Sequence, residues 1–193
     1  MIKYCSQIMT KMLVKNNVIC AEEDRIYEYG FETFLASLIN ITTVLIIGVI
    51  SGRLIHTLLF LISYSSVRQF SGGYHAKSHK RCFLIFLGIT LSTLILIKHM
   101  VLFESPLFLI INLSISLGII FRLAPLEHCN NPLNKFEKTR YKHIARGLSL
   151  ALGAVALLGL FIPYVYQYSL YIVFALLWVG IMLVLGKRKG ESK

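Results

Sequence analysis

The chain has 193 residues and a net charge of +11, and 56% of its residues are hydrophobic. Its mean hydropathy of +0.69 is too high for an ordinary soluble domain, so the composition excludes a cytosolic globular protein. No nucleic-acid-binding motif accompanies the positive charge, and we expect the basic residues to orient membrane segments rather than to bind nucleic acid.

The first 30 residues are predicted to form an amphipathic segment on the cytoplasmic side that does not span the membrane. Apolar side chains recur at helical spacing with lysines on the other faces, and Asn16-Asn17 would end the helix. This helix either lies in the membrane interface or packs on the rest of the protein. Its apolar positions are Ile2, Cys5, Ile8, Met9, Met12 and Leu13.

Six transmembrane helices are predicted to follow, because apolar stretches of about 17–21 residues separate the charged clusters and about 20 residues cross a bilayer. The expected spans are 31–51, 54–70, 82–103, 106–125, 147–165 and 168–186. The second is short and rich in serine, and its alternative is a re-entrant or broken segment. We therefore expect an all-α integral membrane helical bundle in a single domain, 1–193. It comprises the N-terminal segment 1–30, the bundle 31–186 and a basic tail, 187–193.

The distribution of basic residues predicts the orientation of these spans. All but two of the 20 Lys and Arg residues fall on one side of the predicted membrane, and the exceptions are Arg53 and Lys98. Basic loops stay in the cytoplasm, so we expect a multi-pass protein of the cytoplasmic membrane with both termini inside. The four cysteines also fall on or next to this reducing side, where structural disulfides are not expected.

The polar stretch between the second and third predicted spans carries the residues best suited to chemistry. Gly72-Gly73 allows backbone shapes closed to other residues and close approach of another chain segment. Cys82 stands where the third span begins, and a helix start with Lys80 and Arg81 beside it favours a thiolate nucleophile. His75 could take the thiol proton and return it to a leaving amine.

The choice of histidine depends on the backbone between the two groups. Seven residues of continuous helix would place His75 about 10 Å from Cys82 along the axis, at ~1.5 Å per residue, so this pair requires a bend. His79 is the alternative base, because residues three apart lie near each other on a regular helix.

A metal site is a further interpretation of the same residues. His75, His79 and Cys82 form an H-x3-H-x2-C pattern that could supply three zinc ligands. No acidic residue or fourth ligand accompanies them in this stretch, so we expect neither a metal nor another cofactor.

Three stretches of this sequence resemble the AgrB family of quorum-sensing peptide processors. They are Arg68 through Gly72-Gly73-Tyr74-His75-Ala76 to Cys82, then Ala124-Pro125-Leu126-Glu127 with Asn131-Pro132-Leu133, and Tyr29-Gly30-Phe31-Glu32. The resemblance implies a membrane-embedded cysteine endopeptidase, likewise expected to be a homodimer, with Cys82 as nucleophile and His75 as general base. Its partner would be a small AgrD-like precursor peptide, from which it removes an acidic tail through an acyl-enzyme thioester before a thiolactone or lactone ring closes.

Other residues are candidates for supporting this reaction. Gln69, Ser71 and Glu32 could orient His75 or bind the oxyanion, and Gly73 belongs to the matching motif. Arg68 could anchor the acidic tail of a precursor, or it could be a snorkelling charge at the boundary with membrane lipids. The alternative function is a transporter or exporter, or a metal-binding membrane protein without protease activity, although few ionisable residues lie inside the predicted spans.

Overall fold

The computed structural model describes residues 2–16, 18–74, 78–100, 106–127 and 133–189. These residues form seven α-helices and one short 3-10 turn at Ala21–Glu23, so the predicted all-α class is confirmed. The helices are α1 (Ile2–Lys15), α2 (Asp24–Ile50), α3 (Leu54–Ser71), α4 (His79–Met100), α5 (Pro106–Leu123), α6 (Lys135–Gly159) and α7 (Pro163–Arg188).

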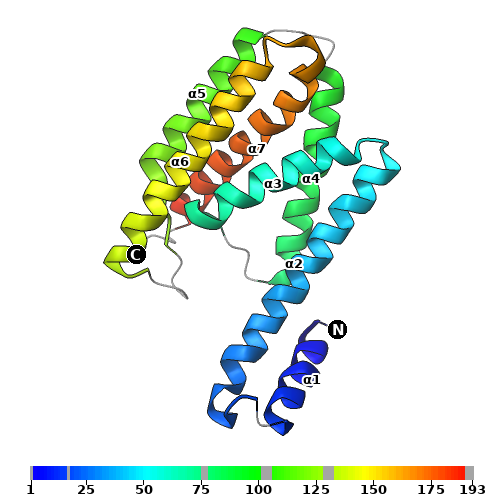
Figure 1. Cartoon of the computed structure of the whole chain (residues 1–193), viewed down its shortest axis with the longest axis vertical. Coiled ribbons are helices and arrows are strands. Elements are labelled where there is room, and N and C mark those ends of the chain that lie inside the picture. The colour runs from blue at the N-terminus through cyan, green and yellow to red at the C-terminus, as the bar shows by residue number, and fades with distance from the viewer. Residues whose placement is uncertain (1, 17, 75–77, 101–105, 128–132, 190–193) are drawn as a thin grey trace.

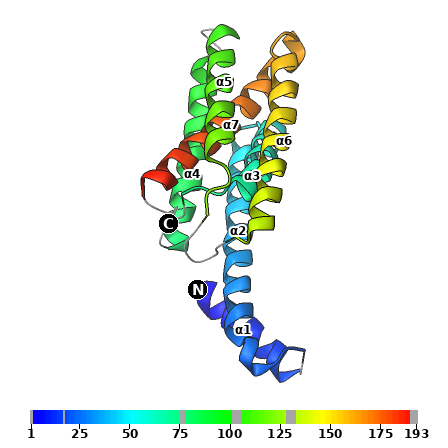
Figure 2. The ribbon, with the colours of Figure 1, turned by 90° about the vertical axis from the view of Figure 1, so that its left-hand side faces the viewer.

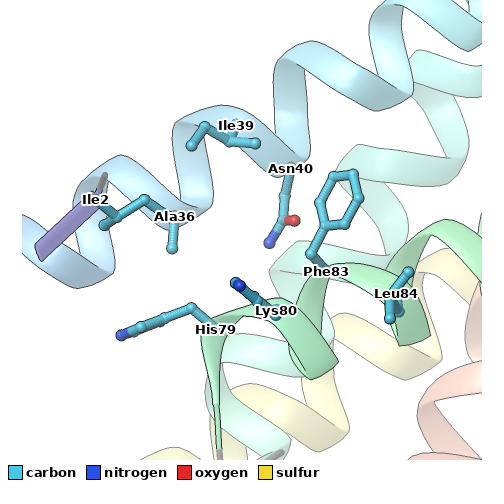
Figure 3. Close-up of a pocket in the computed structure, with 8 residues that line it drawn as sticks. All are labelled: Ile2, Ala36, Ile39, Asn40, His79, Lys80, Phe83 and Leu84. Carbon is cyan, nitrogen blue, oxygen red and sulfur yellow. The ribbon is translucent and has the colours of Figure 1, made fainter.

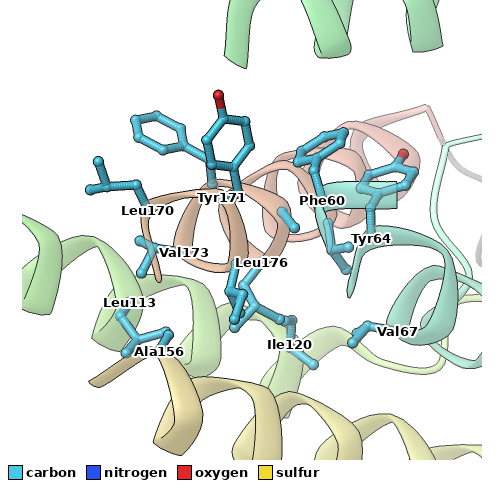
Figure 4. Close-up of a cluster of buried hydrophobic side chains, with 14 of the residues drawn as sticks. Phe60, Tyr64, Val67, Leu113, Ile120, Ala156, Leu170, Tyr171, Val173 and Leu176 are labelled. Atoms are coloured by element: carbon cyan, nitrogen blue, oxygen red, sulfur yellow. The ribbon is translucent and has the colours of Figure 1, made fainter. Parts of the chain in front are cut away.

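Helix α7 forms the centre of the bundle, with α3, α5 and α6 packed around it (Figure 1). It is apolar on all sides, and a helix of that kind is buried on all sides. Side chains of the neighbouring helices surround α7 in one continuous core (Figure 4). The core includes Leu170, Tyr171, Val173 and Leu176 of α7, Phe60, Tyr64 and Val67 of α3, Leu113 and Ile120 of α5, and Ala156 of α6.

Helix α1 and the first half of α2 form an arm that extends away from the bundle (Figures 1 and 2). Within the arm, α1 packs along α2, and Gln7 donates a 3.0 Å hydrogen bond to Glu28. The buried side chains of α1 are Ser6 and Thr10, whereas the apolar Tyr4 and Met12 are exposed. The predicted helix is therefore present and packed on α2, with much of its apolar surface still uncovered.

Four of the described helices are long and apolar enough to cross a membrane: α2, α4, α5 and α7. The protein is thus a helical membrane protein, and the number of six spans stays a prediction, because α3 and α6 do not meet the same standard of length and hydropathy. Helix α3 is continuous from Leu54 to Ser71 and shows no break. Helix α2 begins at Asp24, ahead of the first predicted span at 31–51, and ends at Ile50, next to the predicted end.

The largest boundary error concerns α6, whose first three turns were predicted to be a basic loop. The helix begins at Lys135 because Asn134 and Glu137 form a capping box. Asn134 Oδ1 accepts a 2.7 Å hydrogen bond from the Lys135 N–H, and Glu137 Oε2 accepts one of 2.9 Å from the Asn134 N–H. The boundary between the predicted spans 147–165 and 168–186 was also misplaced, since α6 ends at Gly159 and Pro163 is the first residue of α7.

One end of the bundle collects the C-terminal ends of α3, α5 and α7 and the first turns of α4 and α6. We call it the basic end, because it carries Arg68, Arg81, Arg122, Arg146 and Lys187. The stretch after α3 and the stretch after α5 meet there in a parallel backbone bridge between Gly72 and Leu126. This end holds the candidate site.

Candidate active site

Residues Ser71–Tyr74, which we call the 71–74 segment, run between α7 and the stretch that follows α5. Leu126 N–H donates a 2.9 Å hydrogen bond to Ser71 O, and Tyr74 N–H donates one of 2.9 Å to Met182 O of α7. Lys189, just after α7, places its ammonium 4.4 Å from the centre of the Tyr74 ring. Main-chain atoms of three distant parts of the sequence therefore fix the position of the 71–74 segment.

Three glycines make this close approach possible. Gly72 and Gly73 have φ values of +67° and +122°, which side chains of L-residues rarely allow. A Cβ on Gly72 would overlap the carbonyl oxygen of Leu126, and one on Gly73 would overlap the Arg68 guanidinium. On α7, a Cβ on Gly186 would lie only 2.6 Å from Tyr74 N. The predicted use of Gly72-Gly73 for close backbone approach is confirmed.

Arg68 joins the last turn of α3 to the same segment. Its Nη2 donates a 2.5 Å hydrogen bond to Tyr74 O. Its Nη1 is buried and has no hydrogen-bond acceptor among the residues that the structure describes. A buried N–H without a hydrogen-bond acceptor lowers the stability of the fold.

Cys82 lies in the first turn of α4, with its N–H bonded to Ser78 O at 3.0 Å and its side chain exposed. Its thiol lies within electrostatic range of Arg68 and Tyr64 of α3. Phe86, one turn further on, contacts the Tyr64 ring with 5.5 Å between centroids, so this face of α4 is turned toward α3. Burial among apolar groups opposes a thiolate at Cys82, and this effect exceeds the favourable effect of the Arg68 charge.

Tyr64 is the residue that the sequence analysis missed. It is 8% exposed, and its hydroxyl lies near both Arg68 and Cys82. Its only sequence signal was its position four residues before Arg68, which places the two side chains on one face of α3. Spacing within one helix could not show that α4 packs against that face.

Of the two candidate bases, the structure describes only His79. His75 lies outside the described residues, so its pairing with Cys82 stays a prediction. His79, the alternative base, has its Nε2 3.3 Å from Glu32 Oε2 of α2. Glu32, proposed as a support for His75, is thus engaged with a different histidine.

The remaining predicted site residues have different environments. Gln69 is exposed on α3, and Ser71 is fully buried, with its hydroxyl 3.4 Å from Gly72 O. No group of three His, Cys, Asp or Glu side chains within the described residues could hold a metal ion. The H-x3-H-x2-C pattern includes His75, which is not described, and is therefore not tested.

The fold and the site define a class: a helical membrane protein with a cysteine in the first turn of one helix and a glycine-dependent backbone crossing at the basic end. Residues 6–183 match the family model described as "AgrB: Accessory gene regulator B", and the chain belongs to this family. The resemblance noted in the sequence is thereby confirmed over nearly the whole chain.

Two relatives come from Clostridium perfringens. The "Putative AgrB-like protein 2" of strain 13 is 29% identical over 62% of this chain and 58% of its own length. The "Putative AgrB-like protein" of strain SM101 is 26% identical over 72% of this chain and 68% of its own length. The chain thus spans less than two thirds of the first relative, and no solved structure matches it.

Proposed function

We propose that this protein is a membrane-embedded cysteine endopeptidase that processes a small AgrD-like precursor peptide. Membership of the AgrB family supports the substrate class. The observation that carries the proposal is the position of Cys82, which is exposed in the first turn of α4 and faces Arg68 and Tyr64. A helix start and a nearby guanidinium both favour the thiolate that such chemistry needs, and they act against the larger opposing effect of apolar burial.

The proposed reaction has two acyl-transfer steps. Cys82 Sγ attacks the carbonyl carbon between the signal sequence and the acidic tail, and His75 passes the thiol proton to the departing amine. The tail leaves, and the signal sequence remains as a thioester on Cys82. A Cys or Ser inside the peptide then attacks the thioester, which closes the ring and restores the Cys82 thiol. The thioester conserves the acyl activation, so no ATP is needed while water is kept away.

Arg68 has a proposed role in the first step. Its buried Nη1 lacks an acceptor among the described residues, while its Nη2 is held by Tyr74 O. A guanidinium fixed in this way is preorganised to stabilise the oxyanion that forms when Cys82 attacks. The same group could hold a carboxylate of the acidic tail, and we favour the oxyanion because the Arg68 charge acts on the Cys82 thiol.

The proposal includes the membrane arrangement predicted from the sequence. We place the protein in the cytoplasmic membrane as a six-span homodimer with both termini in the cytoplasm. The basic end would then face the compartment in which a precursor peptide is synthesised. Its positive charge would attract an acidic tail.

Co-expression with a candidate precursor tests the function directly. The precursor should carry a central Cys or Ser and an acidic tail, and mass spectrometry would follow loss of the tail. We expect wild-type protein to release it and Cys82→Ala to leave the precursor intact while still inserting in the membrane. Cys5→Ala is the matched control, because Cys5 is also an exposed cysteine but lies on α1. Normal processing by Cys82→Ala would overturn the proposal.

A further inference from the structure

A pocket of about 340 Å³ lies between α2 and the first two turns of α4, and Ile2 of α1 contributes to its wall (Figure 3). Side chains of α2 and α4 face each other across it in Figure 3. The lining residues are Ile2, Ala36, Ile39, Asn40, His79, Lys80, Phe83 and Leu84. Its size falls within the range of small-molecule sites, about 300–1,000 Å³.

The lining of this pocket includes His79, the alternative base, but not Cys82. The residues of α4 that line the pocket face α2. Phe86, on the same face of α4 as Cys82, contacts Tyr64 of α3.

The lining is mostly hydrocarbon. Five of the eight residues are aliphatic or aromatic, and the polar ones are Asn40, His79 and Lys80. A predominantly apolar lining with a few polar groups suits a ligand with an acyl chain and a polar end. Helix α2, which forms one wall, has only 11% of its most apolar stretch buried within the chain and is open to lipid.

The positive charge at the pocket favours lipids with an anionic headgroup. Lys80 is exposed and lines the pocket, and the carboxylate of Glu32 on α2 is paired with His79. Lys3, also exposed, follows Ile2 on α1. Basic pockets between membrane helices bind anionic headgroups, which a zwitterionic lipid does not match.

We propose that this pocket is a binding site for one anionic phospholipid, with an acyl chain between α2 and α4 and the phosphate at Lys80. The bound lipid would hold the arm and the first turns of α4 together. The proposal concerns lipid binding by the folded chain and does not depend on the proposed peptidase activity.

The test measures lipid retention by the full-length protein in mild detergent, using native mass spectrometry with phosphatidylglycerol and phosphatidylcholine as probes. We expect wild-type protein to retain one phosphatidylglycerol in preference to phosphatidylcholine. Ala36→Phe, which fills the pocket, should weaken retention at least about tenfold. Lys80→Gln, which leaves the packing unchanged, should weaken it about fivefold.

Two matched controls make the result specific to the pocket. Ser37→Phe adds the same side chain to an exposed position of α2, and Arg81→Gln removes a neighbouring exposed charge outside the lining. Both should retain lipid as the wild type does. If Arg81→Gln and Lys80→Gln lost lipid retention equally, a diffuse basic surface would account for binding, and the proposed site would be wrong. Unchanged retention by Ala36→Phe, or a preference for free palmitate over phosphatidylglycerol, would also overturn the proposal.

Discussion

Helices α7 and α2 have nearly the same length, 26 and 27 residues, and both are apolar enough to cross a membrane. Their surroundings differ sharply, because 72% of the most apolar stretch of α7 is buried inside the chain and only 11% of that of α2. Hydropathy therefore identifies a span without telling whether protein or lipid covers it. Here the covered helix holds the backbone beside the candidate nucleophile, while the uncovered helix carries the arm.

The contrast predicts the largest effect at Gly186 of α7. Gly186→Ala would push a Cβ against Tyr74 N and displace the 71–74 segment, since neither backbone can move easily. We expect precursor processing to fall at least about tenfold with membrane insertion retained.

Gly180→Ala on the same helix is the control for this change. Its Cβ would meet Ile119 side-chain atoms at 3.7 Å, an ordinary contact, and processing should stay near wild type. If the two variants behaved alike, the close crossing at Gly186 would not matter for the site.

Because the two helices differ in burial, substitutions in α7 and in α2 should change the free energy of unfolding by different amounts. Leu176→Ala in α7 removes a fully buried side chain and should lower the free energy of unfolding by about 2–4 kcal/mol. Leu38→Ala in α2, where Leu38 is 49% exposed, should change it by less than about 0.5 kcal/mol. Equilibrium unfolding in mixed micelles measures both, and similar values would remove the distinction between covered and uncovered helices.

A substitution at Tyr64 should have an intermediate effect, on the rate of cleavage rather than on packing. Tyr64→Phe keeps the ring packed on Phe86 and removes the hydroxyl near Arg68 and Cys82. We expect cleavage to slow by about tenfold, because hydrogen bonds to charged groups contribute about 1.5–3 kcal/mol. Tyr171→Phe, at a buried tyrosine of α7 that contacts His56 instead, should leave the rate unchanged.

The smallest effect is expected where the arm meets α4. The Glu32–His79 pair is partly exposed, with side-chain exposures of 17% and 41%, so a double-mutant cycle should give a coupling below about 1 kcal/mol. His79→Gln should reduce processing by less than about threefold, whereas His75→Gln should abolish it. A complete loss with His79→Gln would instead make His79 the general base.

Sequence reasoning located the helices well because apolar runs and prolines are local signals. It missed the start of α6 because lysines at 135 and 138 suggested a loop, although Asn134 with Glu137 is a capping signal present in the sequence. The meeting of Gly72 with Leu126 and of Tyr74 with Met182 could not be predicted, because hydropathy contains no information on which distant segments touch. Tyr64 was missed for the same reason.

The crossing of the 71–74 segment has a consequence for experimental design. Tyr74, Leu126 and Met182 act there through an amide or a carbonyl, and every standard substitution keeps those atoms. Conventional alanine scanning would therefore score these positions by their side chains alone. Semisynthetic replacement of the Tyr74 or Leu126 amide by an ester would remove one donor at a time and report what each main-chain bond contributes.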